Sequence, residues 1–156
     1  MGTLKFVRVL AAALTLGFSL SAQSKDPWIG DWKLNVSKST YYPGPPPQSQ
    51  SVKVEPLEGV IRYVFDGITG QGAKRHFEYS AKFDGKYRPV QGNQDVDAVA
   101  FKLTGERSYK QLNKKDGNIF VAISTFSADG KVWTQAATGK DAQGRPFKNT
   151  QVRERQ

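Results

Sequence analysis

The chain has 156 residues, a formal net charge of +9, one histidine and no cysteine, and its length predicts a single domain. The absence of cysteine excludes disulfides, a lipid-anchored cysteine and thiol catalysis, and one histidine excludes a site with several histidine ligands. The basic residues form no run of five or more, so we predict a solvated basic surface and no nucleic-acid partner.

Residues 1–24 have the order of a secretory signal peptide. Lys5 and Arg8 precede an almost wholly apolar run over residues 9–20, and small residues follow, among which Ala22 and Ser24 fit the cleavage pattern best. The run is too short to cross a bilayer, which takes roughly 20 apolar residues. We therefore predict cleavage, with Ser21, Ala22 and Ser24 as the candidate positions and Ser24 as the best fit. We also predict a periplasmic or secreted location and a mature domain over residues 25–156 with no membrane span. A membrane anchor or a buried helix is the alternative.

A long proline-rich connection follows the first predicted strand, residues 32–36. It covers residues 37–50, contains Pro-Gly-Pro-Pro-Pro, and has room for a short helical turn near its start. Prolines lack the amide donor and favour an extended chain, so this segment is not a central strand. We predict that it crosses between strands as a stiff strap, with Tyr41 and Tyr42 packed on a barrel mouth. A mere connector is the alternative.

Nine further strands are predicted between turn signals. Asp-Gly pairs at residues 66–67, 84–85, 116–117 and 129–130 are typical of hairpin turns, and Gln143-Gly144 indicates another. The strand over residues 76–83 alternates between apolar and polar side chains, as half-buried antiparallel strands do. The runs rich in β-branched and aromatic residues are 51–55, 60–65, 76–83, 87–90, 98–103, 108–113, 119–126, 132–138 and 147–153.

Strands joined in series by tight turns form a meander, and closing the meander removes its two exposed edges. We therefore predict an all-β fold, an up-and-down antiparallel β-barrel of about eight to ten strands. A β-sandwich is the alternative, but it needs crossover connections that are longer than most of those here.

The first strand opens with Gly30-Asp31-Trp32-Lys33-Leu34. This motif resembles the Gly-x-Trp motif of the calycin superfamily, the lipocalins and fatty-acid-binding proteins. Residues 26–35 and the proline-rich segment are also similar to bacterial exported proteins described only as lipocalin-like. The resemblance implies a barrel floor in which Gly30 allows a tight turn and Trp32 plugs the closed end. It also implies an arginine over this ring, for which Arg153 and Arg155 are the candidates.

The fatty-acid-binding branch of that superfamily holds its ligand carboxylate with an arginine and a tyrosine on the last strands. Arg153 matches that arginine by position only, and the chain has no Arg-x-Tyr sequence near its end. The helical lid of that branch is replaced here by the proline-rich segment.

The inward side chains decide whether a barrel holds a ligand. The register after Gly130 stays open, because turns of two and three residues put opposite faces of the next strand inward. Four side-chain amides on the late strands are candidates for a polar interior that orients a ligand head group. They are Gln111, Asn113, Gln135 and Gln151. The aromatic and aliphatic residues expected to point inward are Phe77, Tyr79, Phe83, Phe101, Ile123 and Trp133 or its neighbours.

Patterns for catalysis or metal binding are poor. His76 lies on the polar face of its strand, which favours a surface role over a base or a haem ligand. Asp95 and Asp97 have the spacing to share one face and bind Ca²⁺, but a solvated turn is the preferred interpretation. Residues 67–72 lack the helix and lysine of a phosphate loop. We predict no catalytic residue, no metal and no cofactor.

The function predicted from the sequence is non-enzymatic binding of a small hydrophobic or amphipathic ligand by a monomeric barrel of the cell envelope. One alternative is a solid-core barrel that acts as a protein or polysaccharide adaptor through its basic surface. Another is an enzyme, which requires clustered acidic, tyrosine or arginine side chains in the cavity. The candidate ligand-binding residues of the cavity and its mouth are Tyr41, Tyr42, Phe77, Tyr79, Phe101, Ile123, Trp133 and Arg153.

Overall fold

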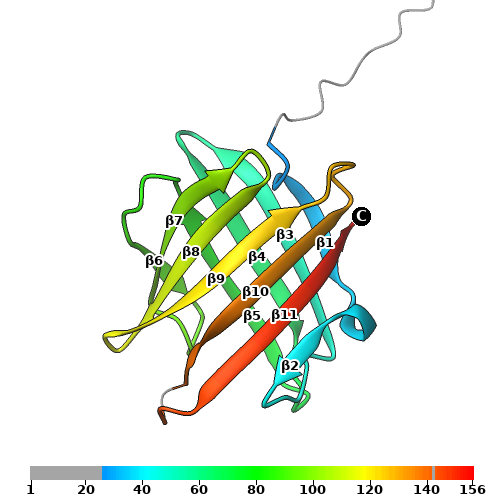
Figure 1. Cartoon of the computed structure of the whole chain (residues 1–156), viewed down its shortest axis with the longest axis vertical. Helices are drawn as coiled ribbons and strands as arrows, with labels where there is room; N and C mark the ends of the chain where they lie inside the picture. Colours follow the sequence, from blue (N-terminus) through cyan, green and yellow to red (C-terminus); the bar gives the residue numbers. More distant parts are fainter. Residues whose placement is uncertain (1–25, 142) are drawn as a thin grey trace, which may run out of the picture.

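Ten antiparallel strands close into an up-and-down barrel in the computed structural model, which describes residues 26–141 and 143–156. Strands that follow one another in the barrel pair with each other, and β1 pairs with β11 to close it (Figure 1). The predicted fold class is therefore confirmed. The barrel strands are β1 (Gly30–Leu34), β3 (Ser49–Leu57), β4 (Val60–Ile68), β5 (Lys74–Ala81), β6 (Arg88–Gln91), β7 (Ala98–Gly105), β8 (Ser108–Lys115), β9 (Asn118–Phe126), β10 (Val132–Lys140) and β11 (Pro146–Arg155).

The predicted signal peptide lies outside the described residues. Within the part that the structure describes, no helix is long and apolar enough to cross a membrane.

The sequence did not predict the short strand β2 (Thr40–Tyr42), which shares an edge of β11 with β1. The last residues of β11 pair with β1, and Lys148–Thr150 of β11 pair with β2. Between β1 and β2 the chain makes the 3₁₀ turn η1 (Val36–Lys38), where a helical turn was predicted. Between the stretches of β11 that pair with β1 and with β2, the Ser39 hydroxyl accepts a hydrogen bond from the amide of Val152 at 3.0 Å. A strand of three residues directly before proline has too little pattern to be seen in sequence.

Three of the four predicted Asp-Gly turns are confirmed, at residues 84–85, 116–117 and 129–130. The prediction of a turn at Asp66-Gly67 is wrong, because both residues lie inside β4 and pair with β3 and β5. Gly67 is used there for a close approach: a Cβ on it would lie 2.4 Å from the carbonyl oxygen of Ser49. The chain turns just beyond, where the Thr69 amide donates to the Ala73 carbonyl at 2.8 Å.

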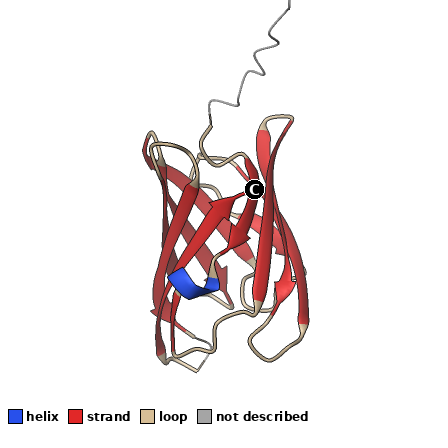
Figure 2. Ribbon diagram, turned by 90° about the vertical axis from the view of Figure 1, so that its right-hand side faces the viewer, coloured by secondary structure: helices blue, strands red, loops and turns tan. Residues whose placement is uncertain are grey.

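One half of the barrel interior is packed with aromatic rings. Trp32 is 1% exposed and donates its indole N–H to the carbonyl of Trp28 at 3.0 Å. Its ring lies 5.5 Å from Phe126 and 5.8 Å from Trp133, in edge contacts that aromatic pairs favour. We call this half the closed end; Figure 2 shows the barrel from the side.

Arg155 fastens the N-terminal segment to this closed end. Its guanidinium lies 4.3 Å from the centre of the Trp32 ring and donates to the carbonyls of Pro27, Ile29 and Gly130. Gly30 has a φ of 138°, and a Cβ on it would collide with this guanidinium. Of the two arginines expected over Trp32, the structure thus places Arg155 there.

Candidate functional site

The other half of the barrel interior contains three cavities of about 320, 460 and 140 Å³. Arg75 and Gln151 line all three, so they are adjoining parts of one internal space. We call this half the open end. The barrel interior is therefore not filled throughout. The internal space has two walls, one aromatic and one polar.

One wall of the internal space is aromatic. Phe65 and Phe77 stack with their ring centres 4.3 Å apart, and Tyr79 follows 5.6 Å from Phe65. These side chains come from neighbouring positions of β4 and β5, because Phe65 pairs directly with Phe77. Alternation along both strands therefore presents them side by side to the cavity.

The facing wall consists of side-chain amides from β8, β10 and β11. Gln111 donates to Asn113 at 2.6 Å, and Gln135 donates to the Gln111 oxygen at 3.2 Å and to the Ser124 hydroxyl at 3.3 Å. Gln111 and Asn113 are buried, yet the Asn113 amide nitrogen has no hydrogen-bond partner within the described chain. The late-strand amides named from the sequence thus do line a polar interior.

Arg153 lies where this amide wall meets the aromatic closed end. Its side chain is 1% exposed, and its guanidinium stacks 4.4 Å above the ring of Trp133. It donates to Gln50 at 2.7 and 3.1 Å and to Gln151. Its remaining nitrogen, Nη1, is buried without a partner among the described residues, and Arg153 lines the smallest of the three cavities.

No carboxylate of the described chain compensates the charge of Arg153. Burial lowers the pKa of this guanidinium to about 10, so it stays protonated at neutral pH. The polar groups with an electrostatic effect on it are tyrosines, Tyr41, Tyr79 and Tyr109. Burial raises the pKa of each of these hydroxyls, that of Tyr109 to about 12, so they remain neutral. The buried positive charge is therefore uncompensated.

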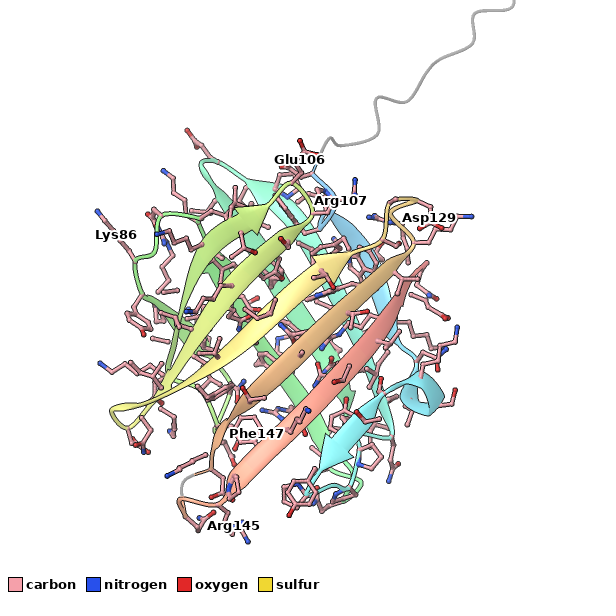
Figure 3. All side chains as sticks on the ribbon, viewed as in Figure 1. Lys86, Glu106, Arg107, Asp129, Arg145 and Phe147 are labelled. Atoms are coloured by element: carbon pink, nitrogen blue, oxygen red, sulfur yellow. The ribbon has the colours of Figure 1, made fainter. Side chains whose placement is uncertain are left out.

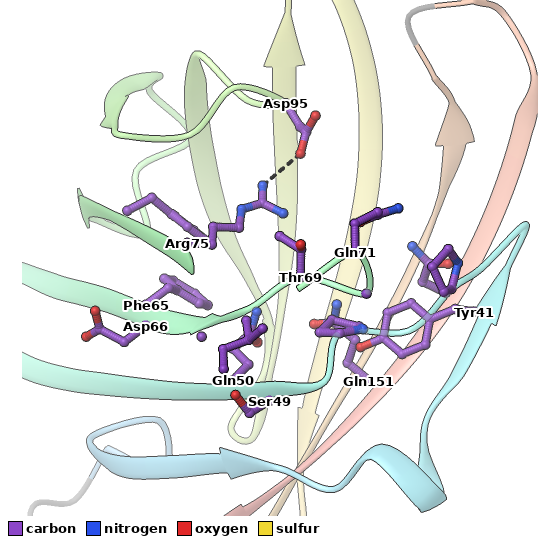
Figure 4. A pocket seen from close by; sticks show the side chains of 17 residues that line it. Tyr41, Ser49, Gln50, Phe65, Asp66, Thr69, Gln71, Arg75, Asp95 and Gln151 are labelled. Atoms are coloured by element: carbon purple, nitrogen blue, oxygen red, sulfur yellow. Dashed lines mark hydrogen bonds and ion pairs between the residues drawn. The ribbon is translucent and has the colours of Figure 1, made fainter. Parts of the chain in front are cut away.

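The mouth of the internal space lies between the proline-rich strap and the loop after β4 (Figure 4). Pro45 of the strap packs on Gly70, where a Cβ would lie 2.6 Å from the Pro45 ring. Arg75 crosses the mouth to reach Asn93 at 2.7 Å and Asp95 at 2.8 Å, the latter contact drawn in Figure 4. Tyr41 points into the cavity there, and its buried hydroxyl has no partner among the described residues.

The predicted site residues separate into three groups. Tyr41, Phe77, Tyr79 and Arg153 line the internal space. Phe101 and Trp133 point inward, each 1% exposed, but belong to the packed part: Phe101 stacks on Tyr109 at 4.9 Å, and Trp133 donates to Ser124 at 3.0 Å. Two predictions are wrong, those for Tyr42 and Ile123.

Tyr42 is 63% exposed because it follows Tyr41 on β2, and successive residues of a strand face opposite sides. Ile123 is 38% exposed and points outward from β9 for the same reason, since its neighbours Ala122 and Ser124 are buried.

Sequence reasoning missed Gln50, Arg75 and the contact of Arg75 with Asp95. Both strands begin earlier than predicted, β3 at Ser49 and β5 at Lys74. Gln50 continues the inward alternation of Val52 and Val54, and Arg75 that of Phe77 and Tyr79. Extending each strand by two residues would have found them.

The groups considered for metal or base chemistry are spread over the surface. His76 and Asp66 are both 61% exposed, and their contact of 2.7 Å lies on the outside of the barrel. Asp95 and Asp97 have different partners, because Asp97 binds Lys115 at 2.9 Å and the Asp116 amide at 3.0 Å. Within residues 26–141 and 143–156, no group of three or more His, Cys, Asp or Glu side chains is placed to hold a metal.

The chain matches none of the family models against which it was compared. No curated protein is similar to it in sequence either. The closed antiparallel barrel is consistent with a calycin-like fold.

Proposed function

We propose that this barrel binds a small amphipathic molecule with an acidic head group, placing the head group beside Arg153. The observation that carries the proposal is the buried guanidinium with a free Nη1 and no carboxylate partner in the described chain. Burying a charge without compensation costs several kcal/mol. An anionic head group offsets that cost by pairing with the guanidinium.

The groups around Arg153 suit such a head group. The Tyr41 hydroxyl and the Asn113 amide nitrogen are both buried donors without a partner in the described chain. Both line the same internal space as Arg153 or a part adjoining it. A carboxylate accepts several hydrogen bonds at once, so it is able to satisfy donors that the protein leaves open.

The aromatic wall suits the apolar part of the molecule. Phe65, Phe77 and Tyr79 give a continuous ring surface leading from the mouth inward. The two larger cavities, of about 320 and 460 Å³, fall within the range of roughly 300–1,000 Å³ that is usual for small-molecule sites. We propose binding without turnover, in the periplasm or outside the cell. The groups buried at the cavity are amides, rings and the Arg153 guanidinium, whereas Asp95 and Asp116, two of the carboxylates that line it, are each 74% exposed.

Tryptophan fluorescence tests this function, since Trp133 lies directly under Arg153. The probes are dodecanoate, dodecanol and dodecyltrimethylammonium, three molecules with one tail and different head groups, each below its micelle concentration. We expect dodecanoate to change the emission saturably at one molecule per chain. We expect dodecanol to bind at least tenfold more weakly, because a charge-assisted pair with arginine is lost, and the cation not to bind.

Equal affinity for dodecanol and dodecanoate would show that Arg153 does not select the head group. The absence of any saturable signal from all three probes would remove ligand binding in this cavity.

A further inference from the structure

The outside of the wall formed by β7 to β10, which faces the viewer in Figure 1, has an unusual composition. Its outward positions carry exposed lysines and aliphatic side chains, while its inward positions are buried or half-buried except at strand ends, as at Leu103 of β7. The remaining outward positions of these strands hold alanine, serine, threonine, leucine, valine and Lys140, so none is acidic. We call this surface the lysine–aliphatic face and define it by Lys102, Lys110, Lys114, Ile119, Val121 and Ile123.

Strand register brings these side chains together. Lys102 of β7 stands directly opposite Lys110 of β8, and Lys110 stands opposite Ile123 of β9. Lys114 stands opposite Ile119 in the same way. Ile119 is 55% exposed and Ile123 is 38% exposed. The lysines therefore flank one side of an aliphatic strip on β9, while alanine and threonine of β10 lie on its other side.

The opposite wall of the barrel is built differently. On β3 to β5 the outward charges alternate in sign, and Arg62 joins Glu55 at 3.1 Å and also joins Glu78. Lys53 also pairs with Glu55, at 2.8 Å. The lysines of the lysine–aliphatic face have no such ion pair with any described residue. Acidic residues near this face are confined to turns at the barrel ends, as Glu106 and Asp129 show in Figure 3.

Folding explains only Lys114 of the lysine–aliphatic face, whose ammonium lies 5.9 Å from the ring centre of Tyr87 in a cation–π contact. Like charges directly opposite each other on neighbouring strands destabilise a sheet, so Lys102 and Lys110 work against the barrel. Ile119 and Ile123 do not belong to the buried core cluster. Both features are explained if the face meets a partner that is negatively charged and apolar beneath its charge.

We propose that the lysine–aliphatic face docks on the surface of a bilayer containing anionic phospholipids. Lysines keep their charge at head-group level while their stems and the isoleucines lie on the apolar side, as in other interfacial surfaces. An acidic protein is the competing partner. Protein interfaces are enriched in arginine and aromatic residues and depleted in lysine, which is the reverse of this face. This inference goes beyond the proposed ligand binding and does not depend on it.

The test is sedimentation with sucrose-loaded vesicles of pure phosphatidylcholine or of phosphatidylcholine with 30% phosphatidylglycerol. It uses the full chain as expressed, with its N terminus determined by mass spectrometry so that all variants are compared in the same form. Each lysine near an anionic surface contributes about fivefold in affinity. We therefore expect the triple variant K102Q/K110Q/K114Q to bind the anionic vesicles at least tenfold more weakly than the original chain.

The matched control is K33Q/K53Q/K74Q, which removes the same charge from exposed lysines of β1, β3 and β5. It is expected to bind within about twofold of the original chain, whereas I119S/I123S loses part of the binding without any change of charge. Circular dichroism checks that each variant is folded. The proposal is overturned if the two lysine triples lose equal amounts of binding, or if the original chain shows no preference for anionic vesicles. It is also overturned if polyglutamate, a soluble acidic polymer, competes for the chain as well as the anionic vesicles do.

Discussion

Arg153 and Arg155 lie two residues apart on β11, and each stacks its guanidinium on a tryptophan. Their hydrogen bonds differ. Arg155 donates to three backbone carbonyls and thereby ties the N-terminal segment to the last strand. Arg153 is more deeply buried, donates only to side-chain amides, and keeps one nitrogen without a partner. We interpret Arg155 as a structural residue and Arg153 as the residue that meets the ligand.

Substituting each arginine by methionine separates these two roles. Arg155→Met removes charge-assisted hydrogen bonds to carbonyls, so we expect the free energy of unfolding to fall by about 3 kcal/mol. Arg153→Met removes an uncompensated buried charge, so we expect its free energy of unfolding to lie within about 1 kcal/mol of that of the original chain. We expect the same variant to bind dodecanoate at least tenfold more weakly. Denaturant unfolding and fluorescence titration measure the two effects. If Arg153→Met destabilised the barrel as much as Arg155→Met, Arg153 would be structural as well.

The residue pattern identified much of the site but could not complete it. Alternation alone placed Phe77 and Tyr79 inward, because their strand has one apolar and one polar face. The pairing of Arg75 with Asp95 joins residues 20 positions apart across a loop, which no periodicity encodes. The free nitrogen of Arg153 is likewise a property of three-dimensional packing, since it depends on which partners fail to reach it.

At the level of the strands, β9 shows why one inward prediction failed. Its outward residues Ile119 and Ile123 are more apolar than the buried Ala122 and Ser124. Hydrophobic periodicity assigns the more apolar face to the core, and here that face belongs to the proposed membrane surface. The Asp66-Gly67 error has a related cause, since an Asp-Gly pair is compatible with a turn but the register of β3 and β4 decides whether one forms.

The facing pair of Lys102 and Lys110 allows a prediction at this level. Lys110→Glu converts a like-charge pair into an opposite-charge pair, so we expect the free energy of unfolding to rise by about 0.5 kcal/mol. Lys110→Gln removes only the repulsion and should lie between Lys110→Glu and the original chain. Thermal or urea unfolding at low salt measures the order of the three proteins. If the glutamate variant is the least stable of the three proteins, the Lys102–Lys110 pair does not destabilise the barrel.

The whole molecule is a barrel with two unlike halves. The closed end is filled by Trp28, Trp32, Phe126 and Trp133, and the open end holds an internal space between an aromatic and an amide wall. Turn signals and strand periodicity predicted the closed meander, because each strand carries its own alternation. They could not predict how the interior is divided, because that depends on side-chain volumes contributed by strands far apart in sequence.

The most direct test of the central claim is a crystal structure of the full chain with dodecanoate bound. The account predicts the carboxylate within hydrogen-bond distance of Arg153 Nη1, with the alkyl chain along Phe65 and Phe77 toward the mouth at Tyr41. A structure in which Nη1 still has no anion beside it, while the dodecanoate lies outside the barrel or the internal space has collapsed around Arg153, would contradict the account.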